Sequence, residues 1–521
     1  MKFFSSDRFL VRLFQVVFFL FFCWVFVIVL ESFFKQQLTP FIFVLPLMLF
    51  LFCLYYCINK YFDENEKKLK YLTAIIIGFC ILVYFFLANK MKFYANADLE
   101  CIYKIALRYA KTHDFTTAYK AVTLYDYLAT YPNNHMVFFM LSIFYRILNS
   151  LNLLKYYLTA SVNLSALFMS LSLIFTWLSC KEIFGYKKSL FIVILTGMFL
   201  PLTLYVSYFY TDVLALPFFT GALYLYFKAI KIEKTKKRLL LFALSTLVFS
   251  IGYKMKGSLG IPFLVCVIYL LLKWNWRKSI PAVLCLILIF TVNISIIKTG
   301  FNLLGIVNEE RLYKHEFPSE HWIAMGLLDP GGFYLPDFQH TLSLKNSTIK
   351  KKECRKIISQ RLNEMIDKGK VYSHLKNKTD FIWSEADYHV SLQVWEYPSD
   401  PYRYGLENFN RLVHPNSKIY NLFKKGEPAN DFFMIYTKCF HLLFFVMLFI
   451  GTFKMFIRPT INARLIYQGI TLGIALFLLI WEARSRYLLS LTPAMLMLMF
   501  YGFDDLYLLS QRIVDRVKNN N

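Results

Sequence analysis

The residues best suited to chemistry are acids and bases that lie beside long apolar segments. Asp98 follows one such segment, and Glu482, Arg484 and Arg486 precede the last one. A carboxylate can take a proton from a hydroxyl, and a guanidinium presents a planar fork of donors that suits phosphate. If both sets lie on the same side of a bilayer, they can flank an anionic lipid substrate. A lipid-dependent enzyme is therefore the leading interpretation.

Asp98 has a competing structural role, and Glu100 is a second catalytic candidate. Because Asp is a good N-cap, Asp98 could simply begin a helix over residues 99–110. Glu100 shares a face with Asp98 only if the segment is extended, since residues two apart diverge on a helix. Asp98 is therefore the predicted base, and Glu100 is kept as the alternative.

Four basic residues are candidates for holding a phosphate: Arg484, Arg486, Lys254 and Lys256. A fixed cation about 4 Å from a leaving phosphate is worth roughly 4 kcal/mol at an effective dielectric near 20. The simpler alternative for the arginines is an ion pair between Glu482 and Arg486, with Arg484 among lipid headgroups. Headgroup contact is also the alternative for the two lysines.

Three further residues are candidates for recognising an acceptor or a sugar. Asp212 lies in a turn between apolar segments, where an uncompensated acid is costly, so it could orient an acceptor or pair with an arginine. An exposed turn residue is the alternative. His321 and Trp322 lie in the longest polar segment, where a ring beside hydrogen-bonding groups suits a sugar. A packed core would use the same two residues.

The composition indicates a membrane protein. Hydrophobic residues make up 57% of the chain and aromatic residues 19%, and the mean hydropathy is positive; ordinary soluble domains are less apolar. The net charge of +25 is scattered over short loops and one long segment. That pattern fits membrane topology and anionic headgroups better than nucleic acid.

The spacing of the His, Cys, Asp and Glu residues fits no known metal-ligand pattern, so no metal site is predicted. A role for a divalent cation in catalysis is left open.

Hydropathy predicts spans near residues 10–30, 40–58 and 71–89. The positive-inside rule assigns the lysine-rich stretch 59–70 to the cytoplasm, so residues 90–135 are expected outside, and the later basic turns place the other candidates on that side. Residues 136–178 hold apolar material for nearly two crossings. Parity favours one span plus a short interfacial or re-entrant helix, for about twelve spans in total.

The predicted fold is an all-α bundle of transmembrane helices with an extracytoplasmic domain of mixed α/β or irregular structure. Residues 1–299 form the N-terminal transmembrane region, including the catalytic loop 90–135. Residues 300–432 form the outer domain, and residues 433–521 form the C-terminal transmembrane region. The expected core of the outer domain is aromatic: Trp322, Phe333, Phe338, Phe381, Trp383 and Trp395.

The order of the motifs resembles the GT-C class of polytopic glycosyltransferases. The motifs are Asp98, Tyr131-Pro132-Asn133-Asn134, Tyr210-Thr211-Asp212, His321-Trp322-Ile323-Ala324-Met325-Gly326-Leu327 and Glu482-Ala483-Arg484-Ser485-Arg486-Tyr487. Within that class the chain is most similar to family-39-like enzymes of Gram-positive bacteria, relatives of protein mannosyltransferases and of aminoarabinose transferases. The resemblance covers residues 93–493. It departs from many relatives in placing three spans, rather than one, before the catalytic loop.

The resemblance implies transfer of a sugar from a polyprenyl-phosphate carrier to an acceptor outside the plasma membrane, by a single inverting displacement. Asp98 matches the family's catalytic aspartate, and Tyr131 and Asn133 would take part in acceptor or sugar recognition. The implied partners are membrane lipids and a cell-envelope acceptor: a wall glycan, a teichoic acid, a lipid or a protein. No nucleic acid is expected. The alternative class is a transporter or flippase of a lipid-linked envelope precursor, which usually shows matched halves and charges within its spans.

Overall fold

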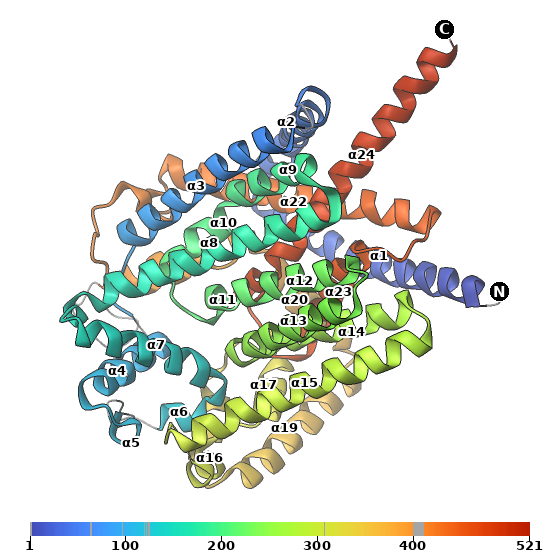
Figure 1. Cartoon of the computed structure of the whole chain (residues 1–521). Coiled ribbons are helices and arrows are strands. Elements are labelled where there is room, and N and C mark those ends of the chain that lie inside the picture. The colour runs from blue at the N-terminus through green and yellow to red at the C-terminus, as the bar shows by residue number, and fades with distance from the viewer. Residues whose placement is uncertain are drawn as a thin grey trace.

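The computed structural model of the chain is a bundle of helices (Figure 1). It describes residues 3–62, 65–95, 97–118, 120, 122, 126–306, 308–399 and 411–520. Within these ranges the chain forms no strand, and the only β-type pairing is an isolated bridge between Phe93 and Leu412. The prediction of a helical membrane bundle is confirmed at this level.

Nine helical segments in the described ranges are long and apolar enough to cross a membrane. Each of the nine segments overlaps one long helix: α1 (Phe3–Gln36), α2 (Thr39–Tyr61), α3 (Glu66–Lys90), α8 (Tyr157–Phe184), α12 (Leu216–Lys231), α13 (Thr235–Met255), α15 (Trp276–Leu303), α22 (Pro428–Ile457) and α24 (Thr492–Asn520). Several of these helices present apolar side chains on their outer faces, as lipid contact requires.

A tenth candidate span is a broken helix. The segment that continues α9 (Tyr186–Met198) is Leu200–Ser207, and the two parts are bent by 61°. Pro201 lies at the start of the second part, where it cannot continue the hydrogen bonds of the first. Two shorter apolar helices, α14 (Gly260–Lys273) and α23 (Arg464–Ile480), complete the set. The total of about twelve spans needs all of these to cross, so it stays a prediction.

The predicted catalytic loop is built from short helices at one end of the bundle (Figure 1). They are α4 (Ala97–Thr112), α5 (Phe115–Ala118), α6 (Tyr127–Thr130) and a 3-10 turn at Pro132–Asn134. Buried residues of α4 recur at helical spacing, including Leu99, Ile102 and Ala106, and α4 packs against α7 (His135–Ser150). With 16 residues, α7 is shorter than a span requires, whereas α8 is long enough. The structure thus has one long apolar helix and one short helix in this region.

The described part of residues 300–432 is also helical. Its elements are α16 (Glu309–His315), α17 (Ser319–Gly326), α18 (Leu335–Ser343), α19 (Ser347–Asp367), α20 (Val371–Trp383), a π-helical turn at Leu392–Glu396, α21 (Tyr397–Ser399) and a 3-10 turn at Lys418–Leu422. The expectation of mixed α/β structure is therefore not confirmed for the described residues.

Two bidentate ion pairs hold these helices together and join them to the predicted catalytic loop. Arg361 in α19 donates to both carboxylate oxygens of Asp337 in α18, at 2.7 and 2.8 Å. Arg311 in α16 donates to both oxygens of Asp126, which caps α6, at 2.7 Å each. Residues 90–135 and 300–399, which were expected on the same side of the membrane, therefore lie against each other; α16 is beside α6 in Figure 1.

The six aromatic residues expected to form one outer core do not do so. Trp383 of α20 is fully buried against spans, with its ring 5.8 Å from that of Phe22 in α1 and 6.1 Å from that of Phe445 in α22. Trp395 instead packs on Tyr420, and Phe333 is exposed. The reason is that α20 is docked onto the bundle, so its apolar face is covered by spans.

A cluster of buried charges lies on the last long helix, within its apolar part. Asp504 accepts hydrogen bonds from Tyr55 of α2 at 2.8 Å and from Lys188 of α9 at 2.6 Å. Asp505 pairs with Arg464 of α23 at 2.7 Å. Breaking one partner of a buried pair leaves an uncompensated charge. Asp505 also pairs with Lys454 of α22, so the two acids join α24 to four neighbouring helices.

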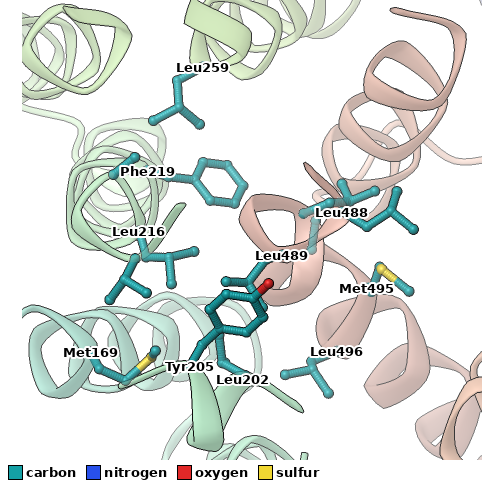
Figure 2. Close-up of a cluster of buried hydrophobic side chains, with 14 of the residues drawn as sticks. Met169, Leu202, Tyr205, Leu216, Phe219, Leu259, Leu488, Leu489, Met495 and Leu496 are labelled. Atoms are coloured by element: carbon teal, nitrogen blue, oxygen red, sulfur yellow. The ribbon is translucent and has the colours of Figure 1, made fainter. Parts of the chain in front are cut away.

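An apolar cluster supports the turn that carries the candidate arginines (Figure 2). The 3-10 helix η8 (Ser485–Leu491) and α24 meet α8, α12 and the broken-span segment α10 (Leu200–Leu204) with η4 (Tyr205–Ser207). The cluster contains Met169, Leu202, Tyr205, Leu216, Phe219, Leu259, Leu488, Leu489, Met495 and Leu496. Leu488 and Leu489 anchor η8, which fixes the position of Arg486 in the same turn.

Candidate functional site

Asp98 lies in the first turn of α4, which begins at Ala97, so it does not take the N-cap position. Its carboxylate accepts a hydrogen bond from Tyr210 Oη at 3.2 Å. Burial raises the pKa of Asp98, while the charge of Arg486 and hydrogen bonds from Tyr210 and Tyr127 oppose the rise. A raised pKa brings a carboxylate closer to the range that general-base catalysis uses near neutral pH.

A buried polar network surrounds Asp98. Asn134 Nδ2 donates to Tyr127 Oη at 2.7 Å and to Tyr210 Oη at 3.4 Å. Asn133, the residue expected to take part in recognition, is exposed, and its amide lies 3.5 Å from Asn134 Oδ1. The asparagine that joins the site is therefore Asn134 and not Asn133, because Asn134 falls on the buried side of the 3-10 turn.

Asp212 is the centre of a second group of charges, and it is only 1% exposed. It forms an ion pair with Lys256, and Arg486 Nε lies 3.5 Å from its other carboxylate oxygen. Arg486 also donates to Tyr208 Oη at 3.2 Å and lies over the ring of Tyr210 at 5.7 Å. Because Tyr210 contacts both Asp98 and Arg486, the carboxylate and the cation belong to one site.

The alternative ion pair between Glu482 and Arg486 is not the arrangement in the structure. Arg486 pairs with Asp212, and Glu482 instead accepts a hydrogen bond from Tyr487 Oη at 2.8 Å. The helix α24 begins only at Thr492, so residues 482 and 486 are not on a regular α-helix. Burial raises the pKa of Glu482, with Tyr487 opposing this rise first and the charges of Arg486, Arg484 and Lys378 after it.

Arg484 points to a different set of partners from Arg486. Its Nη1 lies 3.3 Å from His389 Nε2 and 3.3 Å from Tyr397 Oη. His389 Nδ1 in turn lies 2.6 Å from a carboxylate oxygen of Glu385, which also accepts a hydrogen bond from Ser485. The two arginines of the motif therefore serve two neighbouring clusters.

Glu100 is separated from Asp98 by the geometry of α4. Residues two apart diverge on a helix, and Glu100 pairs with Lys104 at 2.7 Å and with Arg411 at 3.0 Å. Burial opposes ionisation of Glu100, but the hydrogen bonds and charges of Lys104 and Arg411 together lower its pKa. Glu100 is thus a paired anion that helps to hold residue 411 against the start of α4.

Lys254 lies apart from Lys256. It is in the last turn of α13, where its charge acts on His135 and Lys298, and it is not in the ion pairs around Asp212. Lys256 follows the end of that helix and reaches Asp212. Two residues of spacing around a helix end are enough to direct the two ammonium groups to different places.

The three remaining recognition candidates form an aromatic wall beside the site. Tyr131 is buried, with its ring 5.1 Å from that of Tyr127 and 6.0 Å from that of Trp322. His321 lies deeper: its Nδ1 is 2.8 Å from Thr341 Oγ1, and burial lowers its pKa to about 4. The structure therefore has His321 as a neutral core residue, as the alternative interpretation of the sequence proposed. Trp322 O accepts from Glu482 N at 2.9 Å, which joins the wall to the arginine motif.

Sequence reasoning missed Lys378, a fully buried lysine of α20. Its Nζ donates to Gly326 O at 2.5 Å, and a Cβ added at Gly331 would lie 2.7 Å from Lys378 Cε. Burial lowers the pKa of Lys378 to about 7, with the charge of Glu482 opposing the shift. Gly331, which has a φ of +93°, therefore makes room for this side chain.

We expect Lys378→Met to reduce the pH dependence of stability. Because the pKa of Lys378 falls to about 7 in the folded state, the unfolded chain binds more protons from about pH 7 to about pH 10, so stability rises with pH in that window. The variant lacks this titration. Apparent unfolding temperatures at the two ends of the window test it, with the exposed Lys352→Met as the matched control. An unchanged pH dependence in Lys378→Met would contradict the expectation.

Other residues of the site were also not selected from the sequence. Glu385 and His389 have i,i+4 spacing, which is common in polar segments and pointed to nothing by itself. Tyr208 lies in a tyrosine-rich stretch that is equally typical of interfacial aromatics, and Tyr210 was identified only as part of the motif with Asp212, without a role of its own. No group of three or more His, Cys, Asp and Glu side chains is placed to hold a metal ion among the residues described.

Comparison with known proteins supports the membrane class. Curated proteins include no sequence that matches the chain. The model of a family described as "Conserved hypothetical integral membrane protein" matches residues 5–506. Because that match spans nearly the whole chain, the protein belongs to this family of integral membrane proteins.

Proposed function

We propose that the protein is a membrane glycosyltransferase. It would move a sugar from a polyprenyl-phosphate carrier to an acceptor on the extracytoplasmic side of the plasma membrane. The observation that carries the proposal is that Tyr210 joins Asp98 to Arg486 of the arginine motif: the tyrosine hydroxyl donates to the Asp98 carboxylate, and the guanidinium lies over the tyrosine ring. A base beside a motif that carries two arginines is what a displacement at a sugar phosphate needs. The order of motifs along the chain supports the same class.

The reaction is a single displacement. The acceptor oxygen attacks the anomeric carbon of the sugar, and Asp98 takes the hydroxyl proton. The bond between that carbon and the phosphate oxygen breaks, and its electron pair leaves with the phosphate. Arginine and lysine side chains stabilise the negative charge on the leaving group. The configuration at the sugar carbon is inverted, and Asp98 later releases the proton to solvent.

Asp212 is assigned a positioning role in this proposal. Its carboxylate lies between Lys256 and Arg486, so it holds two cations in place and offsets their charge. An orienting contact with the acceptor, which the sequence also allowed, is less well supported because Asp212 is almost fully buried. Trp322 and Tyr131 form the wall against which a sugar ring would pack.

The transporter alternative draws on the charges within α24. Transporters use intramembrane acids as coupling sites. Here Asp504 contacts Tyr55 and Lys188. Asp505 pairs with Arg464 and Lys454, so the two acids hold neighbouring helices together. A coupling role would need these pairs to open, and the enzyme proposal needs no such change.

The experiment compares cell-envelope glycans by mass spectrometry in cells that carry the intact protein, a deletion or Asp98→Asn, with protein levels matched. We expect one sugar substituent to disappear in both the deletion and the Asp98→Asn cells, because Asn cannot act as a carboxylate base. That substituent would identify the acceptor. If the deletion alone changes the envelope, Asp98 is structural and the transporter alternative gains.

A further inference from the structure

The turn between α20 and the π-helical segment has a backbone that ordinary residues avoid. Tyr388 and His389 have φ values of 55° and 66°, although neither is glycine. Such conformations persist only where neighbours hold them, and they concentrate at functional sites. Here Asp387 accepts hydrogen bonds from the backbone N–H groups of His389 and Ser391, both at 3.1 Å, and Tyr205 Oη donates to Tyr388 O at 3.0 Å. The turn is therefore built and held.

The effect of the turn is to aim His389. Its Nδ1 lies 2.6 Å from a carboxylate oxygen of Glu385, and its Nε2 lies 3.3 Å from Arg484 Nη1. Ser485 donates to the same carboxylate. A histidine held through Nδ1 by a carboxylate presents Nε2 to a ligand, which is how such rings are oriented in binding and catalytic sites.

The charges around His389 come from both elements packed on it. Its own segment contributes Glu385 and Asp387, and the arginine motif contributes Arg484. The same nitrogen of that guanidinium also contacts the hydroxyl of Tyr397 in α21. Arg486 and Lys256 already share a carboxylate. The hydrogen bonds of Arg484 in the described part of the chain go to His389 and Tyr397. Its half-buried guanidinium acts on Glu385 and Glu482 through its charge but forms no ion pair with a carboxylate among the described residues.

We propose that Arg484 and His389 bind the phosphate of the lipid carrier, and that His389 takes up a proton when this phosphate binds. The inference rests on the proposed function and assigns the phosphate, which four basic residues could have held, to one of them. If Nδ1–H donates to Glu385 in a neutral ring, the lone pair is on Nε2, which then accepts from Arg484. With an anion between the two side chains, Nε2 must carry a proton to become a donor, and Glu385 supports that positive charge through Nδ1.

The test measures binding to the purified full chain across pH. The probe is the methyl ester of a short-chain polyprenyl phosphate, a phosphodiester whose charge does not change from about pH 5 to about pH 8. Titration calorimetry in two buffers with different ionisation enthalpies counts the protons taken up. We expect uptake of up to one proton and a fall in affinity of up to about tenfold per pH unit as His389 loses its charge.

Three variants separate the roles. His389→Gln is expected to remove both the proton uptake and the pH dependence, and His389→Lys to keep affinity at high pH without that dependence. Arg484→Gln is expected to lower affinity by about tenfold or more at every pH, since a charge-assisted contact is lost. The exposed His340→Gln is the matched control and should behave as the intact protein. Unfolding temperatures establish that each variant is folded.

The outcomes also distinguish the source of the phosphate and the fate of the wider proposal. Tight binding of inorganic phosphate, or equal binding of phosphatidylglycerol in nanodiscs, would overturn the assignment to the carrier. Unchanged proton uptake in His389→Gln would overturn the role of His389. If the probe binds as expected while Asp98→Asn leaves the envelope glycans intact, the phosphate site stands and the transferase function fails.

Discussion

Asp98→Asn is expected to lower the rate of sugar transfer by about 10²–10⁴-fold, which is the range that a general base contributes. Asn keeps the size of the side chain and can still accept the hydrogen bond from Tyr210, but it cannot take the acceptor proton. Transfer from a synthetic polyprenyl-phosphate sugar to an extract of envelope acceptors measures the rate. Carrier binding should change little, because in the proposed reaction Asp98 acts on the acceptor and not on the carrier phosphate.

Glu100→Gln is the matched control for this experiment. Glu100 is two residues away on the same helix, and its carboxylate is held by Lys104 and Arg411. We expect transfer to fall by much less than in Asp98→Asn. The pH profile adds a second test: transfer by the intact protein should fall as pH drops through the raised pKa of Asp98, because the protonated acid cannot act as a base. Equal losses in the two variants would point to a structural role for this part of α4.

Asp212→Asn is expected to have the largest effect on stability. It would leave Lys256 and Arg486 close together without their shared carboxylate, and breaking a buried pair costs about 3–5 kcal/mol. The double variant with Lys256→Met removes one of the two cations as well, so it should recover part of the loss. Unfolding temperature in detergent measures both, with the exposed Asp367→Asn as control.

A different result would change the view of this cluster. If Asp212→Asn were as stable as the Asp367→Asn control, the two cations would have to be compensated by something other than Asp212. If Lys256→Met failed to recover any stability in the double variant, the coupling between Asp212 and Lys256 would be negligible, and Arg486 would be the partner that matters.

Several parts of the candidate site were predictable because they follow from motifs. Asp98, Asp212, Lys256 and Arg486 were selected from charges beside apolar segments, and the structure brings all four into neighbouring contacts through Tyr210. Membrane boundaries make such charges stand out, since they are expensive within the apolar region. Glu100 was selected by proximity in the sequence, and the helix directs it elsewhere.

The sequence by itself determined the class of the protein. Long apolar segments can satisfy their backbone hydrogen bonds in a bilayer only as helices or closed barrels, and the length of these segments selects helices. The sequence also determined that a polar, charged region lies between two sets of apolar segments. These conclusions depend only on local composition and length, which is why they hold without coordinates.

Only the tertiary structure decided how the charges are shared. Three features depend on contacts between residues far apart in the chain. Arg486 pairs with Asp212, Arg484 contacts His389, and α20 packs on the spans. An ionic contact needs a direction as well as a distance, and the direction is set by helix ends and turns such as the one at Tyr388. No local pattern encodes where those side chains finally point.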